Sequence, residues 1–260
     1  MTLTMLLRTV RSVLLKGEQM KQLTIRSVAV FALVGAMGFG ISAIASASPT
    51  TTTTTPSAKF VAAQQLLETQ LAARVTRLTH LTADVTGATS LSASTSLTLQ
   101  ARLSTEAASI NTLVAKVPTD TTFAELDADR AAMYKDNRVY AVMSPQVFEM
   151  IEASLVANQV TTDQGNEATL QTEVTSLVGM AGYENALHHY DNYVLRISNW
   201  SLRIVDIEAN VLAQMPTDWP GDTNVFVNAN HQILAANIAL AYADYDAAVI
   251  GLASGGYTGS

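Results

Sequence analysis

The residues best suited to chemistry in this 260-residue chain lie around its one pair of adjacent histidines. Glu184, His188 and Asp191 follow at intervals of four and three residues, so on a helix they share one face. A carboxylate and an imidazole at that spacing can form half of a metal site. A solvated polar helix face is the simpler interpretation, and the sequence favours it. We predict no cofactor.

His231, on the next predicted helix, is the candidate for the other half of a metal site. If the turn between the helices centres near Trp219, His231 lies opposite Glu208. His188 then lies about 20 residues further along, or about 30 Å at 1.5 Å per residue. One helical hairpin therefore does not bring the two histidines together. The Glu-x-x-His pair of di-iron bundles is also missing.

Aromatic residues form a rough stripe on the same helix. Tyr190, Tyr193 and Trp200 recur at helical spacing, and the hairpin register places Tyr245 beside them. Such a stripe can line a groove for a carbohydrate or an apolar ligand. Aromatic residues at helical spacing more often form the core or its rim, and both interpretations remain open.

Composition excludes several classes of function. The chain carries a formal net charge of −7, so it lacks the basic footprint that nucleic-acid binding needs. It has no cysteine, and hence no disulfide. No Gly-x-Ser-x-Gly elbow, P-loop or dinucleotide-binding glycine pattern occurs.

The N-terminal region has the pattern of a secretory signal. Lys21 and Arg26 precede an apolar run over 28–44, and the small residues of 45–47 follow. We predict an export signal over 1–47, cut after Ala47, with an uncleaved anchor as the alternative. The residues before Met20 suggest that translation starts at Met20, and a long basic region is the alternative. No later segment is expected to span a membrane, and the protein is expected outside the cytoplasm or at the cell envelope.

The rest of the chain divides into three parts. Residues 48–57 form a Thr/Pro linker, 58–254 a helical domain, and 255–260 a flexible Gly-rich tail. Apolar residues recur at helical spacing throughout the domain. They predict helices over 58–85, 94–117, from 122, from 144, over 183–215 and over 223–252.

Local signals mark several helix ends. Thr122 with Glu125 three residues on predicts a capping box, and Pro145 suits the first turn of a helix. Residues 161–166 indicate a break, with a continuous helix to 177 as the alternative. Short breaks between long amphipathic helices imply antiparallel neighbours. We predict an all-α fold, an up-and-down antiparallel bundle of about five or six long helices.

A charged cluster, residues 136–140, leads into an apolar run before Ser144. The step Arg138-Val139-Tyr140 and the pair Pro145-Gln146, with Asp129 as a weaker match upstream, resemble a pattern in uncharacterised helical proteins secreted by actinobacteria and related bacteria. The resemblance covers about 35 residues, from Thr122 to Leu155. It implies a secreted helical fold and brings no catalytic residues.

These observations favour a secreted or envelope-associated helical protein that acts by protein interaction or as a structural element. A protein partner or self-association is expected, and catalysis is not. The first alternative is an extracellular module that binds a small ligand or a metal, through the residues named above. The second is an enzyme of unknown type, whose titratable groups would converge from different helices.

Overall fold

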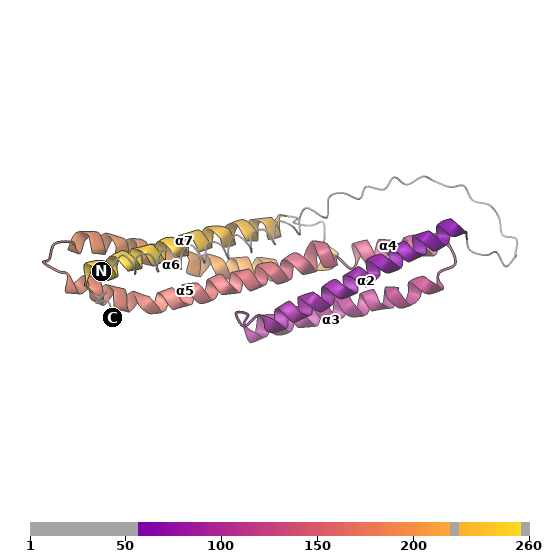
Figure 1. The fold of residues 1–260 in the computed structure, drawn as a ribbon, viewed down its shortest axis with the longest axis horizontal. Coiled ribbons are helices and arrows are strands. Elements are labelled where there is room, and N and C mark those ends of the chain that lie inside the picture. Colours follow the sequence, from indigo (N-terminus) through magenta and orange to yellow (C-terminus); the bar gives the residue numbers. More distant parts are fainter. Residues whose placement is uncertain (1–56, 219–223, 256–260) are drawn as a thin grey trace, which may run out of the picture. The chain divides into compact units, whose positions relative to one another are not determined.

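The computed structural model describes residues 57–218 and 224–255 (Figure 1). Over these residues the regular structure is entirely helical, which confirms the predicted all-α class. The export signal, nearly all of the Thr/Pro linker and of the tail, and the turn around Trp219 lie outside the described residues.

Six α-helices and three short helical segments follow one another along the described chain. They are α2 (Ala58–Gly87), α3 (Ala93–Lys116), η1 (Val117–Thr119), α4 (Phe123–Lys135), η2 (Val139–Met143), α5 (Ser144–Ser176), α6 (Tyr183–Ala213), η3 (Pro216–Asp218) and α7 (Val225–Ala253). Five of the α-helices have 24 residues or more, and α4 has 13. The predicted number of long helices is therefore confirmed.

The helices α2 and α3 form an antiparallel hairpin. Ser92 caps α3 by accepting a hydrogen bond from the Thr95 amide at 3.1 Å. At the open end of the hairpin, the Gln64 side chain donates to the Val117 carbonyl at 2.8 Å. Leucines at helical spacing fill the interface, because one face of each helix is apolar: Leu67, Leu71, Leu78, Leu81, Leu99 and Leu103.

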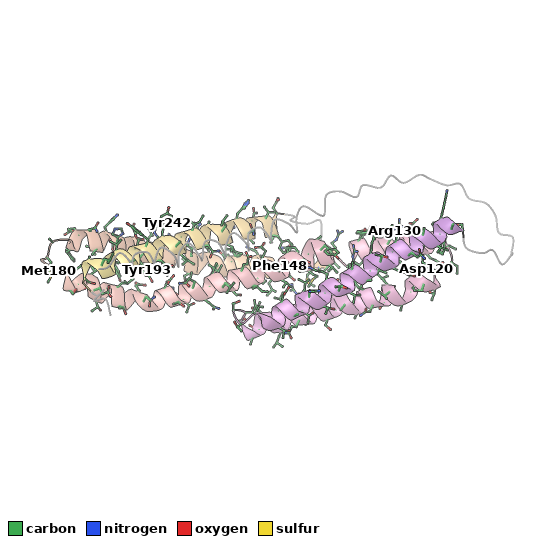
Figure 2. All side chains as sticks on the ribbon, in the orientation of Figure 1. Asp120, Arg130, Phe148, Met180, Tyr193 and Tyr242 are labelled. Atoms are coloured by element: carbon green, nitrogen blue, oxygen red, sulfur yellow. The ribbon has the colours of Figure 1, made fainter. Side chains whose placement is uncertain are left out.

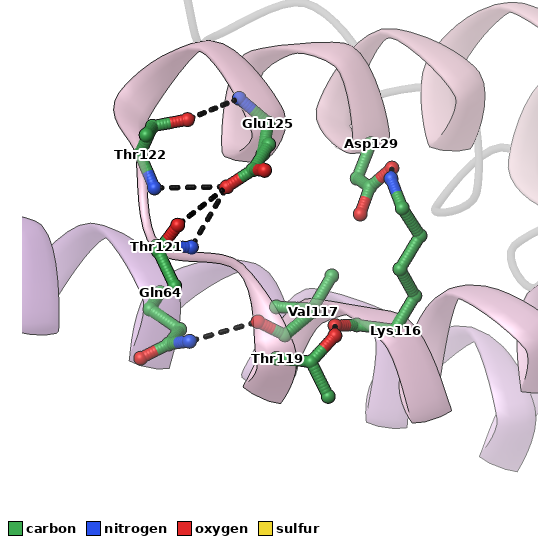
Figure 3. A network of polar contacts seen from close by, with 8 residues as sticks. All are labelled: Gln64, Lys116, Val117, Thr119, Thr121, Thr122, Glu125 and Asp129. Carbon is green, nitrogen blue, oxygen red and sulfur yellow. Dashed lines mark hydrogen bonds and ion pairs between the residues drawn. The ribbon is translucent and has the colours of Figure 1, made fainter.

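The helix α4 begins with the predicted capping box (Figure 3). The Thr122 hydroxyl accepts from the Glu125 amide at 3.3 Å, and the Glu125 carboxylate accepts from the Thr122 amide at 2.9 Å. These bonds satisfy amide groups that the first turn of a helix leaves without partners. Lys116, at the end of α3, pairs with the buried Asp129 and so ties α4 to the hairpin.

The cap gives a prediction for stability. Thr122→Ala is expected to lower the free energy of unfolding by about 1 kcal/mol, because the first turn of α4 loses an acceptor. Thr76→Ala is the matched control, since Thr76 lies exposed inside α2 and bonds only to its own helix at Ala72. Alanine is the better helix former there, so the control should be neutral or slightly stabilising. Urea unfolding followed by circular dichroism measures both.

The helix α5 is continuous from Ser144 to Ser176, so the break predicted at 161–166 is wrong and its alternative, a continuous helix, is confirmed. The buried face of the helix continues through residues 161–166, with Val160, Asp163 and Leu170 all buried. The hydroxyls of the two threonines at 161 and 162 bond to carbonyls four residues back. The polar side chains that indicated a break therefore form their hydrogen bonds within the helix.

The helices α5, α6 and α7 pack against one another side by side (Figure 1). The Tyr193 hydroxyl on α6 donates to the Asp163 carbonyl at 2.6 Å, and the Ser154 hydroxyl donates to Glu208 at 3.0 Å. Residue numbers rise on one helix as they fall on the other, so α5 and α6 run antiparallel. The turn between them uses Gly182 at φ 100°, which favours glycine.

The C-terminal end of α6 is held by side chains from two other helices. Gln146, fully buried at the start of α5, donates to the carbonyls of Val211 at 2.9 Å and Gln214 at 2.8 Å. Arg102 on α3 donates to the carbonyls of Leu212 and Gln214. The last carbonyls of a helix have no partner within it, so these bonds join α6 to the earlier helices.

Candidate functional site

A buried carboxylate on α7 organises a polar network between α6 and α7. The Asp246 side chain is 4% exposed. One of its oxygens lies 2.7 Å from Nδ1 of His189, and the other accepts from Nε of Arg196 at 3.1 Å. Because a buried charge is costly unless it is paired, the contacts with the Arg196 guanidinium and the His189 imidazole account for the carboxylate at this position.

Aromatic rings lie at the outer edge of this network, among them that of Tyr242, which Figure 2 labels. The Arg196 guanidinium lies 5.1 Å from the centre of the Tyr242 ring, and the His189 ring lies edge-on to Tyr245 at 5.8 Å. Both tyrosines are more than half exposed. A histidine held at Nδ1 by a carboxylate keeps its other nitrogen for a second bond. The network thus joins a buried ion pair to an aromatic surface on α7.

The predicted metal triad is not assembled into a ligand set. Glu184, His188 and Asp191 share α6 and are all exposed, as one helix face requires. His188 contacts Asn192 of the same helix, with 3.1 Å between their nitrogens. Among the residues that the structure describes, no group of three or more His, Asp or Glu side chains can hold a metal ion. Within the part of the chain that the structure describes, no second helix brings a carboxylate or an imidazole to complete the triad.

The four predicted groove residues do not share one surface. Tyr193 and Trp200 are 1% and 8% exposed and belong to the core, whereas Tyr245 is 59% exposed. Burial, with the nearby charge of Asp163, raises the pKa of the Tyr193 hydroxyl. Tyr190 is half-buried at the edge of the core. The core-and-rim interpretation therefore describes these aromatic residues, because the packed face of α6 includes Tyr193 and Trp200.

Two residues of the polar network, His189 and Asp246, were missing from the sequence-based candidates. The predicted hairpin register held the signal for them, since it placed Tyr190 near Tyr245. His189 directly precedes Tyr190 on α6, and Asp246 directly follows Tyr245 on α7, so the same register brings these two residues together. An aspartate on an apolar helix, level with a histidine on its neighbour, predicts such a pair.

The outer face of α7 is largely apolar, with the exposed His231 as a polar residue on the same side. We call this face the α7 stripe, and its six members are between 38% and 59% exposed: Val227, Leu234, Ile238, Tyr242, Tyr245 and Leu252. Their spacing of three, four and seven residues places them on one side of the helix. The opposite side packs on α5 and α6 through another set: Phe226, Ile233, Leu240, Ala243 and Ile250.

Because both sides are apolar, α7 is by length and composition able to cross a membrane, and it is the one helix of the described residues that passes this test. The expectation that no segment after the signal spans a membrane did not take the length and apolar composition of α7 into account. Core helices of water-soluble proteins have the same composition, and α7 buries Asp246 against two side chains of α6. The absence of a membrane span stays a prediction.

The chain matches no protein-family model, and comparison with curated proteins and with solved structures gave no match. The resemblance of the segment from Thr122 to Leu155 to secreted actinobacterial proteins stays an expectation from its residues.

Proposed function

We propose that the protein is exported and acts at the cell envelope or outside the cell as a helical interaction protein. Its contact surface is the α7 stripe, and its partner is another protein surface or a second copy of the chain. The export pattern of residues 20–56 supports the location. The single observation that carries the interaction role is the exposed, uncharged stripe along α7.

The dimensions of the stripe suit helix-on-helix packing. From Val227 to Leu252 a helix rises about 37 Å. Contiguous apolar patches of this kind on a protein surface mark interaction sites. Burying one large apolar side chain contributes about 1.5–3 kcal/mol. The stripe holds no Asp, Glu, Lys or Arg, so contact along it brings no like charges together although the chain is acidic.

Photo-crosslinking in the native host tests this proposal. A photoreactive amino acid at Ile238, 50% exposed, is expected to give a discrete crosslinked protein product. The matched position is Leu97 on α3, which is 67% exposed and outside the stripe, and it should give none. Mass spectrometry identifies the product as the same chain or another protein. Equal products at both positions, or adducts with lipid alone, would contradict the proposal.

A charge-insertion variant measures the strength of the contact. Leu234→Lys combined with Ile238→Lys is expected to weaken association at least about 100-fold, since two apolar side chains lose their burial and 1.4 kcal/mol corresponds to a factor of ten. Leu97→Lys is the control and should leave association unchanged. Sedimentation velocity reports self-association, and the yield of the crosslinked product reports a different partner. Circular dichroism checks that both variants keep their helices.

A further inference from the structure

Two arginines one turn apart on α2 face the junction with α4, η2 and α5. Arg74 is only 7% exposed, and its guanidinium lies 5.1 Å from the ring centre of Tyr134 on α4 and 5.3 Å from that of Tyr140 on η2. The Arg77 guanidinium lies 5.0 Å from the ring of Phe148, which Figure 2 labels near the start of α5. Aromatic rings therefore contact both guanidinium groups.

Each of these two side chains makes a hydrogen bond but also has a buried nitrogen without an acceptor. Arg74 donates through Nη1 to the Gln70 carbonyl at 3.0 Å, and its buried Nε has no acceptor. Arg77 donates through Nε to the Ser144 hydroxyl at 3.0 Å, and its buried Nη2 has no acceptor. The ion pairs among the described residues include neither arginine. Two positive charges thus lie at this junction without a carboxylate partner.

An anion would complete this arrangement favourably. Buried charges in proteins are paired, because removing an ion from water without a partner costs several kcal/mol. When rings cover the faces of a guanidinium, its N–H groups remain available in the plane of the group. An oxyanion is the natural acceptor there, because hydrogen bonds between charged groups are stronger than neutral ones.

The element that supplies Tyr140 is itself unusual. The segment η2 is a five-residue π-helix, Val139–Met143. Such widened turns are rare and occur often at functional sites. The first two residues of η2, Val139 and Tyr140, belong to the charged cluster at 136–140 that the sequence singled out. Ser144, the acceptor of the Arg77 bond, begins α5 immediately after this π-helix.

We propose that Arg74 and Arg77 form a binding site for a phosphate group at the junction of α2 with η2. A doubly charged tetrahedral anion matches two unpaired guanidinium groups, since it neutralises both charges. Its several oxygens can accept from Arg74 Nε and Arg77 Nη2, which belong to different side chains. Tyr134 and Tyr140, which are 47% and 36% exposed, form the solvent-facing rim of the site. This inference is independent of the α7 stripe.

Titration calorimetry on the full chain with inorganic phosphate tests the site, with chloride keeping the ionic strength constant. Arg77→Gln is the test variant, because Arg77 is half-buried and its loss removes less packing than that of Arg74. Arg203→Gln is the matched control, since the Arg203 guanidinium also lies over a ring, that of Trp200 at 5.4 Å. Wild type and control should bind phosphate equally, and Arg77→Gln should bind it at least tenfold more weakly.

Thermal unfolding separates a binding role from a purely structural one. Phosphate should raise the unfolding temperature of wild type and of Arg203→Gln, and leave that of Arg77→Gln unchanged. A role in packing alone would instead lower the unfolding temperature of Arg77→Gln by the same amount with and without phosphate. Titration with glycerol 1-phosphate and with phosphatidylglycerol vesicles distinguishes a soluble phosphate from a lipid headgroup. Absence of binding to wild type at millimolar phosphate, or equal binding to Arg77→Gln, would overturn the proposal.

Discussion

The Glu149→Gln variant is expected to be more stable than the wild-type protein at pH 9, by on the order of 3 kcal/mol, and to differ little from it at pH 5. Glu149 is buried on α5. Burial, and secondly the charge of Glu152, raises the pKa of Glu149 from 4.5 to about 8. A side-chain hydrogen bond from Asn230 on α7 opposes the rise only in part.

The direction of the effect follows from proton binding. Because the pKa of Glu149 is higher in the folded protein than in the unfolded chain, the folded state binds the proton more tightly. The stabilisation is complete below about pH 4.5 and is lost as the pH rises to about 8. Glutamine carries no charge at any pH, so it removes this loss. Above pH 8 the wild-type protein must hold a buried carboxylate that the variant lacks.

Urea unfolding between pH 5 and pH 9 measures this difference. Glu184→Gln is the control, since Glu184 is exposed on α6, and its stability curve should run parallel to that of the wild type. In Glu149→Gln the free energy of unfolding should still fall slightly as the pH rises from about 5 to about 7. Burial also raises the pKa of Glu106 on α3, to about 7. Parallel curves for Glu149→Gln and wild type would contradict the assignment.

The second large effect is expected at the α6–α7 network. Asp246→Ala should lower the free energy of unfolding by about 3 kcal/mol, because it leaves His189 and Arg196 without their carboxylate. The value lies at the low end for a broken buried pair, since the Arg196 side chain is 34% exposed and regains some water.

The matched control is Asp206→Ala, at an exposed position of α6. It should change the free energy of unfolding by less than about 0.5 kcal/mol. Urea unfolding at neutral pH, with circular dichroism of the folded states, compares the two variants. An equal loss in both would mean that the network contributes nothing beyond an ordinary surface charge.

Features carried by neighbouring residues were predictable from the sequence. The capping box of Thr122 and Glu125 lies within four residues, and the start of α5 is marked by Pro145. The pairing of α6 with α7 followed from the position of one turn, and the contact of His189 with Asp246 agrees with that register.

Features set by other parts of the chain were not predictable from one helix. Arg74 is an example, since it is buried because tyrosines from α4 and η2 cover it. The π-helical turn η2 has no local signal of its own. Likewise, the apolar residues of α7 predict a helix but do not indicate which of its sides packs against α5 and α6, since both sides are apolar.

The bonds of Arg102 and Gln146 to the end of α6 span 110 and 65 positions of the sequence. The bonds of Arg102 connect the first hairpin to the end of α6, and those of Gln146 hold the same end of α6 from the start of α5. A protease cut in the short connection after Lys135 is therefore expected to leave two fragments that still associate. Each fragment supplies part of the hydrogen bonds at the end of α6. The two fragments should also associate when they are expressed separately. This connection is therefore a suitable place to split the chain.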